Sequence, residues 1–577
     1  MNASIEPAPS AALPLHPPGN SLKTRFKVLT TILFICLSFG LGSIPFLIAE
    51  YKTPSNQIFV GQVDNYPDYN MYFSFIRQSY DGHWLFNNTV TYQPSRRIVI
   101  NLEWLGLGKM MQVFHLSENE ILQLWRFLAA VCLIGGFAFL AANFPLSPKR
   151  WILALALFSL GGGFGSLVSL AVSAHLAPAG WIKSLGIDMW GNLHPFQMIM
   201  GNPHGALGTG LALWGFGFFL MSERRQSYGV GCLTGLVFSV CGFIRPYDLI
   251  SLVAILSAFT VVETVLNGFS ARKVARRLLP IVIILPALAY NIWVFKLDPI
   301  YKFWGTQNEN FKQLPQFYVY YLALGLAGLL ALNRVLQFKR QPLSLAERFL
   351  LVWFLVVFGI MYAGKVVPPL SFSPQIGYAL IAPLILLGLS LQQFNRLAPD
   401  FDTKISPRMA LAFAGLLVAF ANLGTIGFYS LKFFSGKTFQ PSHHLEVYAD
   451  RQEMDAWRWI NGHLPQGRVI MGLPLSCNLL SKYTSMRVVD GHWSVTPHYY
   501  ELADRLYAFF ASHQLGVTEK NLLEEFRPDY IYFGPDERKY GGGRDLERQF
   551  AAGLVYQNEE VSVYQLDPAK DSPVIGK

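Results

Sequence analysis

Two carboxylates four residues apart, Asp64 and Asp68, follow the first long apolar stretch of the chain. A carboxylate beside a cavity can accept the proton of an attacking hydroxyl or help to hold a metal ion. Asp68 stands where a helical pattern begins and equally fits a capping role, since Asp is a favoured helix cap. Asp64 has no helix of its own to cap, so we expect it to carry the chemistry.

Basic side chains stand at the ends of other apolar stretches, where a charge needs a partner. Arg245, with a planar fork of donors, suits an anion, and an ion pair with Asp248 is the alternative. His194 and His204 could bind phosphate oxygens or assist the leaving group, and a structural role is the alternative. Lys365 could bind phosphate, and the alternative is that its side chain only snorkels to the membrane surface. We expect a donor phosphate to meet Arg245, His204, His194 or Lys365.

A third set of residues offers polar or aromatic contacts to a sugar or an acceptor. It comprises Trp84, Asp248, His492 and Trp493. His492 and Trp493 follow a predicted strand, where they could stack on a sugar ring, and an ordinary ordered turn is the alternative reading. We find no Walker loop, GxSxG, paired CxxC or HExxH motif, so no familiar soluble-enzyme signature accounts for these residues.

The composition is that of a membrane protein. Of 577 residues, 52% are apolar, 15% are aromatic and only 14% are charged, and the mean hydropathy is +0.32. The net charge of +10 comes from short Lys and Arg clusters between apolar stretches, where such residues set topology. We therefore expect no nucleic-acid partner.

About eleven apolar stretches are long enough to cross a bilayer as helices. Basic clusters such as Lys149-Arg150, Arg224-Arg225 and Lys339-Arg340 follow every second one, which predicts a cytoplasmic N-terminus. The remaining connections gather the candidate residues on the outer face. The stretches lie near 27–49, 121–143, 151–173, 205–221, 228–244, 247–267, 278–296, 316–335, 348–364, 375–392 and 409–431.

The predicted organisation has three parts. Residues 1–22, rich in Pro, Ala and Ser, read as a disordered cytoplasmic tail. Residues 23–432 form the transmembrane domain, whose outward loop 50–120 carries two amphipathic interfacial helices at 68–80 and 102–114. Residues 440–577 read as an extracytoplasmic α/β domain with a small, mostly parallel sheet.

In this arrangement the chain resembles the GT-C superfamily of integral membrane glycosyltransferases, such as protein mannosyltransferases and aminoarabinose transferases. Asp64 stands shortly after the first span, as does the essential Asp of that family. The segments 487–496, RVVDGHWSVT, and 527–535, RPDYIYFGP, are similar to parts of the extracytoplasmic domains of bacterial members. The Asp64-x-x-x-Asp68 spacing differs from the adjacent or alternate acidic residues of several members.

The resemblance implies inverting transfer of a sugar from a polyprenyl-phosphate donor to an extracytoplasmic glycan, lipid or protein, with Asp64 as general base. It implies a multi-pass protein of the plasma membrane. It does not establish a cofactor, and whether the protein binds a divalent cation, Mg²⁺ or Mn²⁺, is left open. Two other functions use the same features. One is a transporter or flippase for a lipid-linked saccharide, although we find no internal repeat. The other is a membrane scaffold with a glycan-binding domain.

Overall fold

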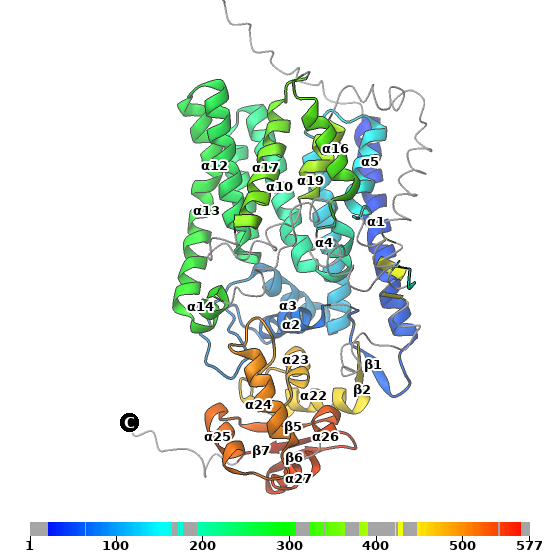
Figure 1. Ribbon diagram of the computed structural model, residues 1–577, viewed down its shortest axis with the longest axis vertical. Helices are drawn as coiled ribbons and strands as arrows, with labels where there is room; N and C mark the ends of the chain where they lie inside the picture. Colours follow the sequence, from blue (N-terminus) through cyan, green and yellow to red (C-terminus); the bar gives the residue numbers. More distant parts are fainter. Residues whose placement is uncertain are drawn as a thin grey trace, which may run out of the picture.

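The computed structural model describes residues 21–63, 65–163, 171, 174–176, 193–306, 323–339, 341–363, 380–390, 422, 425–427, 429–430, 447–540 and 543–566. In this part of the chain, a bundle of long helices stands on a smaller α/β domain, with two short helices between them (Figure 1). Asp64, Lys365 and most of the predicted tail and of the predicted span 409–431 lie outside the described residues.

The long helices of the bundle match the apolar stretches of the sequence. Six of them have the length and apolar composition needed to cross a membrane: α1 (Ser21–Tyr51), α4 (Glu118–Ala141), α10 (Pro203–Arg225), α12 (Asp248–Asn267), α13 (Ala271–Leu297) and α17 (Leu345–Ala363). The shorter helices are α5 (Pro148–Ser159), α9 (Pro195–Gly201), α11 (Tyr228–Ile244), α14 (Pro299–Thr306), α16 (Gly325–Leu336) and α19 (Ile381–Leu389). A polytopic helical membrane protein is therefore confirmed, and the number eleven stays a prediction.

Helix starts follow local sequence signals. Ser117 and Glu120 form a reciprocal capping box at the start of α4. Pro203 occupies the first turn of α10, where its missing N–H costs nothing. Glycines then allow close packing, because a side chain on Gly210 would meet the backbone of α4 at Cys132.

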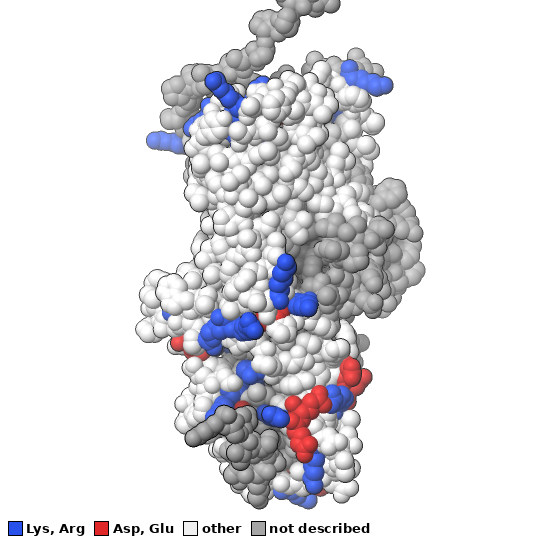
Figure 2. Space-filling model, turned by 90° about the vertical axis from the view of Figure 1, so that its left-hand side faces the viewer, with Lys and Arg blue, Asp and Glu red and all other residues white. Residues whose placement is uncertain are grey.

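On the face that Figure 2 shows, charged side chains are sparse over the middle of the bundle. Lys and Arg lie at the end far from the α/β domain and again near the junction with that domain. At the end far from the α/β domain, Glu223 pairs with both Arg276 and Arg277, over 2.9 and 2.8 Å. Such pairing compensates the cost of burying these charges. Arg348 and Glu263 extend the cluster to α17 and α12. The end of α10, the end of α12 and the start of α13 thus lie at the same end of the bundle, as the positions of the basic clusters in the sequence predict.

Two short helices form a platform between the bundle and the α/β domain. They are α2 (Tyr66–Tyr80) and α3 (Leu102–Phe114), at the positions 68–80 and 102–114 where the sequence predicts two interfacial helices. Asn101 caps α3 by accepting hydrogen bonds from the backbone of Glu103 and Trp104. The platform shares one hydrophobic cluster with the C-terminal domain, in which Phe73 and Trp104 join Leu480 and Trp457.

The C-terminal domain holds a five-stranded sheet with the order β4-β3-β5-β7-β6. Its strands are β3 (Val469–Met471), β4 (Arg487–Val488), β5 (Tyr530–Phe533), β6 (Leu554–Gln557) and β7 (Ser562–Gln565). Helices flank them: α22 (Arg451–His463), α23 (Pro474–Tyr483), α24 (Tyr499–Ala511), α25 (Val517–Phe526), α26 (Pro535–Lys539), α27 (Gly543–Arg548) and the 3₁₀ turn η4 (Ala551–Gly553).

The expectation of a mostly parallel sheet is wrong in part. β3 is parallel to β4 and β5, but β7 is antiparallel to β5 and β6. The short connection between β6 and β7 accounts for the antiparallel pairing of these two strands, because a parallel pair needs a crossover of a dozen or more residues. A second, two-stranded sheet pairs β1 (Gln57–Phe59), from the loop after α1, with β2 (Tyr448–Asp450). It ties the beginning of the C-terminal domain to the first loop.

Candidate active site

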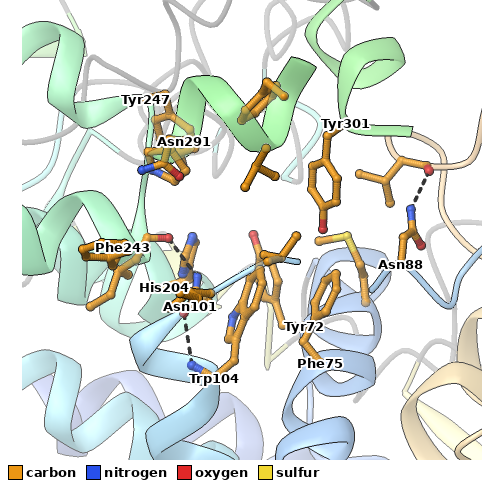
Figure 3. Close-up of a pocket in the computed structure, with 18 of the residues that line it drawn as sticks. Tyr72, Phe75, Asn88, Asn101, Trp104, His204, Phe243, Tyr247, Asn291 and Tyr301 are labelled. Atoms are coloured by element: carbon orange, nitrogen blue, oxygen red, sulfur yellow. Dashed lines mark hydrogen bonds between the residues drawn. The ribbon is translucent and has the colours of Figure 1, made fainter. Parts of the chain in front are cut away.

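A cavity of about 130 Å³ lies where the bundle, the platform and the C-terminal domain meet (Figure 3). Its walls come from α2, α3, the loop before α3, the start of α10, the end of α11, α13, α14 and the loop after β4. Among the lining residues that the structure describes, Asp68 is the one carboxylate and His204 the one histidine, and Lys and Arg are absent. A concave site with a few convergent polar groups is the usual form of a binding site.

Aromatic side chains make up much of the wall. Trp104 stacks on Phe75 with ring centres 4.4 Å apart and planes at 6°, and Tyr72 lies 5.7 Å from Trp104 on the same side of the cavity. The indole Nε1 of Trp104 is buried and makes no hydrogen bond to the described residues. A wall of this kind offers flat apolar surface together with a donor for a polar ligand.

Asp68 lies in the first turn of α2, and hydrogen bonds reach both of its carboxylate oxygens. The amide of Asn65 donates to Oδ2 over 3.0 Å, and Nε2 of His492 donates to Oδ1 over 2.9 Å. Burial alone would raise the pKa of Asp68, but the hydrogen bonds from His492 and from the Asn65 amide bring this pKa below its ordinary value. Asn65, not Asp68, is the capping residue of α2.

His492 comes from the C-terminal domain and is 1% exposed. Its Nδ1 accepts hydrogen bonds from the backbone N–H and from Oγ of Ser494, over 3.2 and 3.1 Å. Since Nδ1 is the acceptor, the ring proton sits on Nε2 and points to Asp68. Trp493 and Ser494 line the cavity, whereas His492 stands behind them.

His204 lies in the first turn of α10, and its Nδ1 contacts a carboxylate oxygen of Glu103 on α3. The other oxygen of Glu103 accepts a hydrogen bond from Nε1 of Trp125 over 2.6 Å. Glu103 was missed from the sequence. A signal was present, since a carboxylate on the apolar face of a predicted amphipathic helix needs a buried partner.

Arg245 is fully buried and does not line the cavity. Its guanidinium lies 3.3 Å from Asp248, and donates to the Gly205 carbonyl over 3.0 Å and to Thr209 Oγ1 over 3.3 Å. The structure therefore shows the ion pair that the sequence left open as the alternative. Gly208 leaves room for the Arg245 side chain, because a Cβ there would lie 2.3 Å from Arg245 Cδ.

The remaining predicted residues lie apart from the cavity or outside the described chain. His194 is buried at the start of α9 and contacts the Ala323 carbonyl through Nε2 over 2.8 Å. Trp84 is 67% exposed and does not line the cavity. Asp64 and Lys365 belong to the part of the chain that the structure does not describe. The structure thus brings together Asp68, His204, His492 and Trp493.

Within the described residues, no group of three or more His, Cys, Asp or Glu side chains is arranged to hold a metal ion. Both oxygens of Asp68 already accept hydrogen bonds from Asn65 and His492.

No protein-family model and no curated protein matches the sequence. Solved structures do match it over nearly its whole length. The archaeal oligosaccharyltransferase AglB from Archaeoglobus fulgidus, in complex with an inhibitory peptide and a dolichol-phosphate, aligns with a TM-score of 0.51 and 11% identity over 96% of this chain and 76% of AglB. The arabinofuranosyltransferase AftD from Mycobacteria aligns with a TM-score of 0.50 and 14% identity over 95% of this chain and 42% of AftD.

The chain has the GT-C fold. ArnT from Cupriavidus metallidurans, in a structure bound to undecaprenyl phosphate, is also similar, with a TM-score of 0.46 and 13% identity over 94% of this chain and 99% of ArnT. The alignments with AglB and AftD confirm the GT-C fold that was expected from the resemblance. At such low identity the likeness concerns the fold, so the chemistry of this GT-C chain has to be argued from its own residues.

Proposed function

We propose that the protein is a membrane glycosyltransferase that moves a sugar from a polyprenyl-phosphate donor to an extracytoplasmic acceptor. The observation that carries this proposal is the aromatic cavity at the junction of a GT-C helix bundle and its C-terminal domain, with Asp68 and His204 in its wall. The AglB structure contains a dolichol-phosphate and an inhibitory peptide, which supports a lipid-phosphate donor and an outward acceptor for this chain too.

The proposed orientation follows from the charges. The basic ends of α10 and α13 lie opposite the C-terminal domain, and positively charged connections favour the cytoplasm. The N-terminus is then cytoplasmic, and the cavity opens near the outer surface of a plasma membrane. A lipid-linked donor would lie with its chain among the helices and its sugar in the cavity.

In the proposed reaction the acceptor oxygen attacks the anomeric carbon while Asp64 takes the proton of that hydroxyl. The bond between the anomeric carbon and the phosphate oxygen breaks, and its electron pair leaves with the polyprenyl phosphate. Attack from the face opposite the leaving group inverts the anomeric centre. Asp68, held ionised by His492, adds negative charge beside the developing positive charge on the sugar.

The other site residues divide by their contacts. His204 and Lys365 are proposed to meet the donor phosphate, and Trp493 to contact the sugar or the acceptor. Arg245 and Asp248 pair with each other, so we assign them to holding the α10–α11 end of the cavity in place. His194 supports the same region from α9.

The test uses purified protein, a polyprenyl-phosphate sugar and a panel of acceptors. Asp64→Asn is expected to abolish transfer while the protein stays folded and binds the donor. Wild-type turnover in Asp64→Asn would contradict the assignment of the base. Movement of the lipid-linked sugar across a liposome membrane without sugar transfer would instead favour a flippase. Glycan binding with neither transfer nor movement would favour a scaffold.

A further inference from the structure

Glu103 is a buried carboxylate that no step of the proposed reaction uses. Its side chain is 1% exposed and that of His204 is 8% exposed. Trp125 donates to one oxygen of Glu103 over 2.6 Å, and Nδ1 of His204 contacts the other. A carboxylate this deeply buried is costly unless charged or strongly polar partners compensate it. The two contacts supply that compensation.

The contact with Glu103 fixes the tautomer and the orientation of His204. A carboxylate only accepts, so Nδ1 of His204 carries a proton and donates it to Glu103. The ring is further held by Tyr72, with ring centres 5.0 Å apart, and by Trp104, at 5.9 Å. Carboxylate–histidine pairs of this kind orient the ring and make its other nitrogen more basic.

The second nitrogen of His204 is left for a ligand. Among the described residues no hydrogen bond reaches Nε2, and His204 lines the cavity whereas Glu103 does not. Since the described lining contains no Lys or Arg, a protonated His204 is the one cationic group there. A phosphodiester oxygen only accepts, so a hydrogen bond from Nε2 to it requires a proton on Nε2 in addition to the proton on Nδ1.

We propose that Glu103 is a positioning residue that holds His204 as an imidazolium, with Nε2–H directed at the phosphate of a polyprenyl-phosphate ligand. This inference rests on the proposed function and names the group that receives the leaving phosphate. As the bond from the anomeric carbon to the phosphate oxygen breaks, the electron pair stays on that oxygen, and the Nε2–H hydrogen bond to it strengthens. No proton needs to leave His204.

The test is binding of farnesyl phosphate, farnesol and inorganic phosphate to the full-length protein in nanodiscs. His204→Asn and Glu103→Gln are each expected to weaken farnesyl phosphate binding about tenfold or more, the usual worth of a hydrogen bond to a charged group. Farnesol binding is expected to stay unchanged. The double variant should bind no more weakly than His204→Asn, because Glu103 acts through the imidazole. Inorganic phosphate should bind far more weakly than farnesyl phosphate if the site takes a lipid headgroup.

Glu118→Gln is the matched control, since Glu118 pairs with Arg77 at the start of α4 and does not line the cavity. Equal loss of farnesol and farnesyl phosphate binding in Glu103→Gln would overturn the proposal, as would unchanged farnesyl phosphate binding. If Glu103→Gln does not fold, ¹⁵N resonances of His204 in the wild type decide. A protonated Nδ1 and a change in the ¹⁵N chemical shift of Nε2 on adding farnesyl phosphate support the proposal. An unprotonated Nδ1 overturns it.

The two proposals fail separately. If the wild type binds farnesyl phosphate through His204 but transfers no sugar, the glycosyltransferase activity is wrong and the phosphate site stands. If Glu103→Gln transfers sugar and binds farnesyl phosphate as the wild type does, the phosphate site is wrong and the activity stands.

Discussion

Nε2 of His492, on the C-terminal domain, donates a hydrogen bond to Oδ1 of Asp68 on α2, 424 positions earlier in the chain. The carboxylate in the wall of the cavity therefore depends on a side chain from another domain. The imidazole is held from behind by Ser494, so its direction is fixed before any ligand arrives. Docking of the C-terminal domain is thus part of building the site.

His492→Leu is expected to raise the pKa of Asp68, because burial is then no longer offset by the hydrogen bond from the imidazole. The acid limb of the pH profile of kcat/KM should move upward accordingly. In the wild type the lowered pKa stabilises the fold above the ordinary pKa of about 4. This contribution is lost as the pH falls through the lower, folded-state value.

His492→Gln is the control for that experiment, since its amide can still donate to Asp68. It should keep the acid limb closer to that of the wild type. A loss of activity in His492→Leu that is equal at every pH would show a purely structural role for His492.

Trp493→Ala should raise the KM for sugar donor or acceptor about tenfold, because an aromatic surface of the cavity is lost. Trp84→Ala is the matched variant, since Trp84 is 67% exposed and lies outside the cavity. Both substitutions remove a tryptophan side chain that the sequence suggested as a contact to the sugar or the acceptor. Equal effects in steady-state kinetics would contradict the placement of Trp493 in the site.

Asp298→Ala should loosen one wall of the cavity. Oδ2 of Asp298 accepts from Ser95 Oγ over 2.9 Å and from the backbone N–H of Arg96 over 2.7 Å, and Oδ1 caps α14 at Ile300. Loss of these bonds is expected to cost about 2–4 kcal/mol, seen as a lower Tm.

Asp545→Ala serves as the comparison for Asp298→Ala, because Asp545 is an exposed carboxylate in surface pairs. Its Tm should change little, since surface pairs contribute little. An unchanged Tm in Asp298→Ala would contradict the role assigned to that residue.

Glu453→Gln should make the stability of the C-terminal domain less sensitive to a rise in pH from about 4.5 to about 8. Burial, together with Glu537 and Asp536, raises the pKa of Glu453 to about 8. The folded state then binds a proton more tightly than the unfolded state, so stability falls as the pH rises from about 4.5 to about 8. The slope is on the order of 1 kcal/mol per pH unit. Thermal unfolding against pH measures it, and an unchanged slope in Glu453→Gln would show that another group causes the loss of stability.

The sequence predicts what depends on local pattern. The apolar stretches, the aromatic spacing of α2 and α3 and the alternation of the C-terminal domain each set a helix or strand without distant partners. The ion pair between Arg245 and Asp248 can be predicted for the same reason, since the two residues stand three positions apart in the sequence.

What the sequence does not reveal is pairing across the chain. Glu103 meets His204 from a helix 101 positions away, and Asp68 meets His492 from another domain. Helical periodicity places each residue on a face, but it does not say which face of which helix lies opposite. The mixed sheet was missed similarly, because strand order depends on how the last hairpin returns to β5.

The pairing of β1 with β2 has a consequence for how the protein is made. Asn56 and Asp450, which meet beside this small sheet, stand 394 positions apart. The ribosome has therefore made all of the long apolar helices that the structure describes before β1 in the first loop can pair with β2. Until then the aromatic residues of α2 and α3 lack the cover of the C-terminal domain, and contacts of such long range form late. The cover of this aromatic platform is thus completed only when translation is nearly finished.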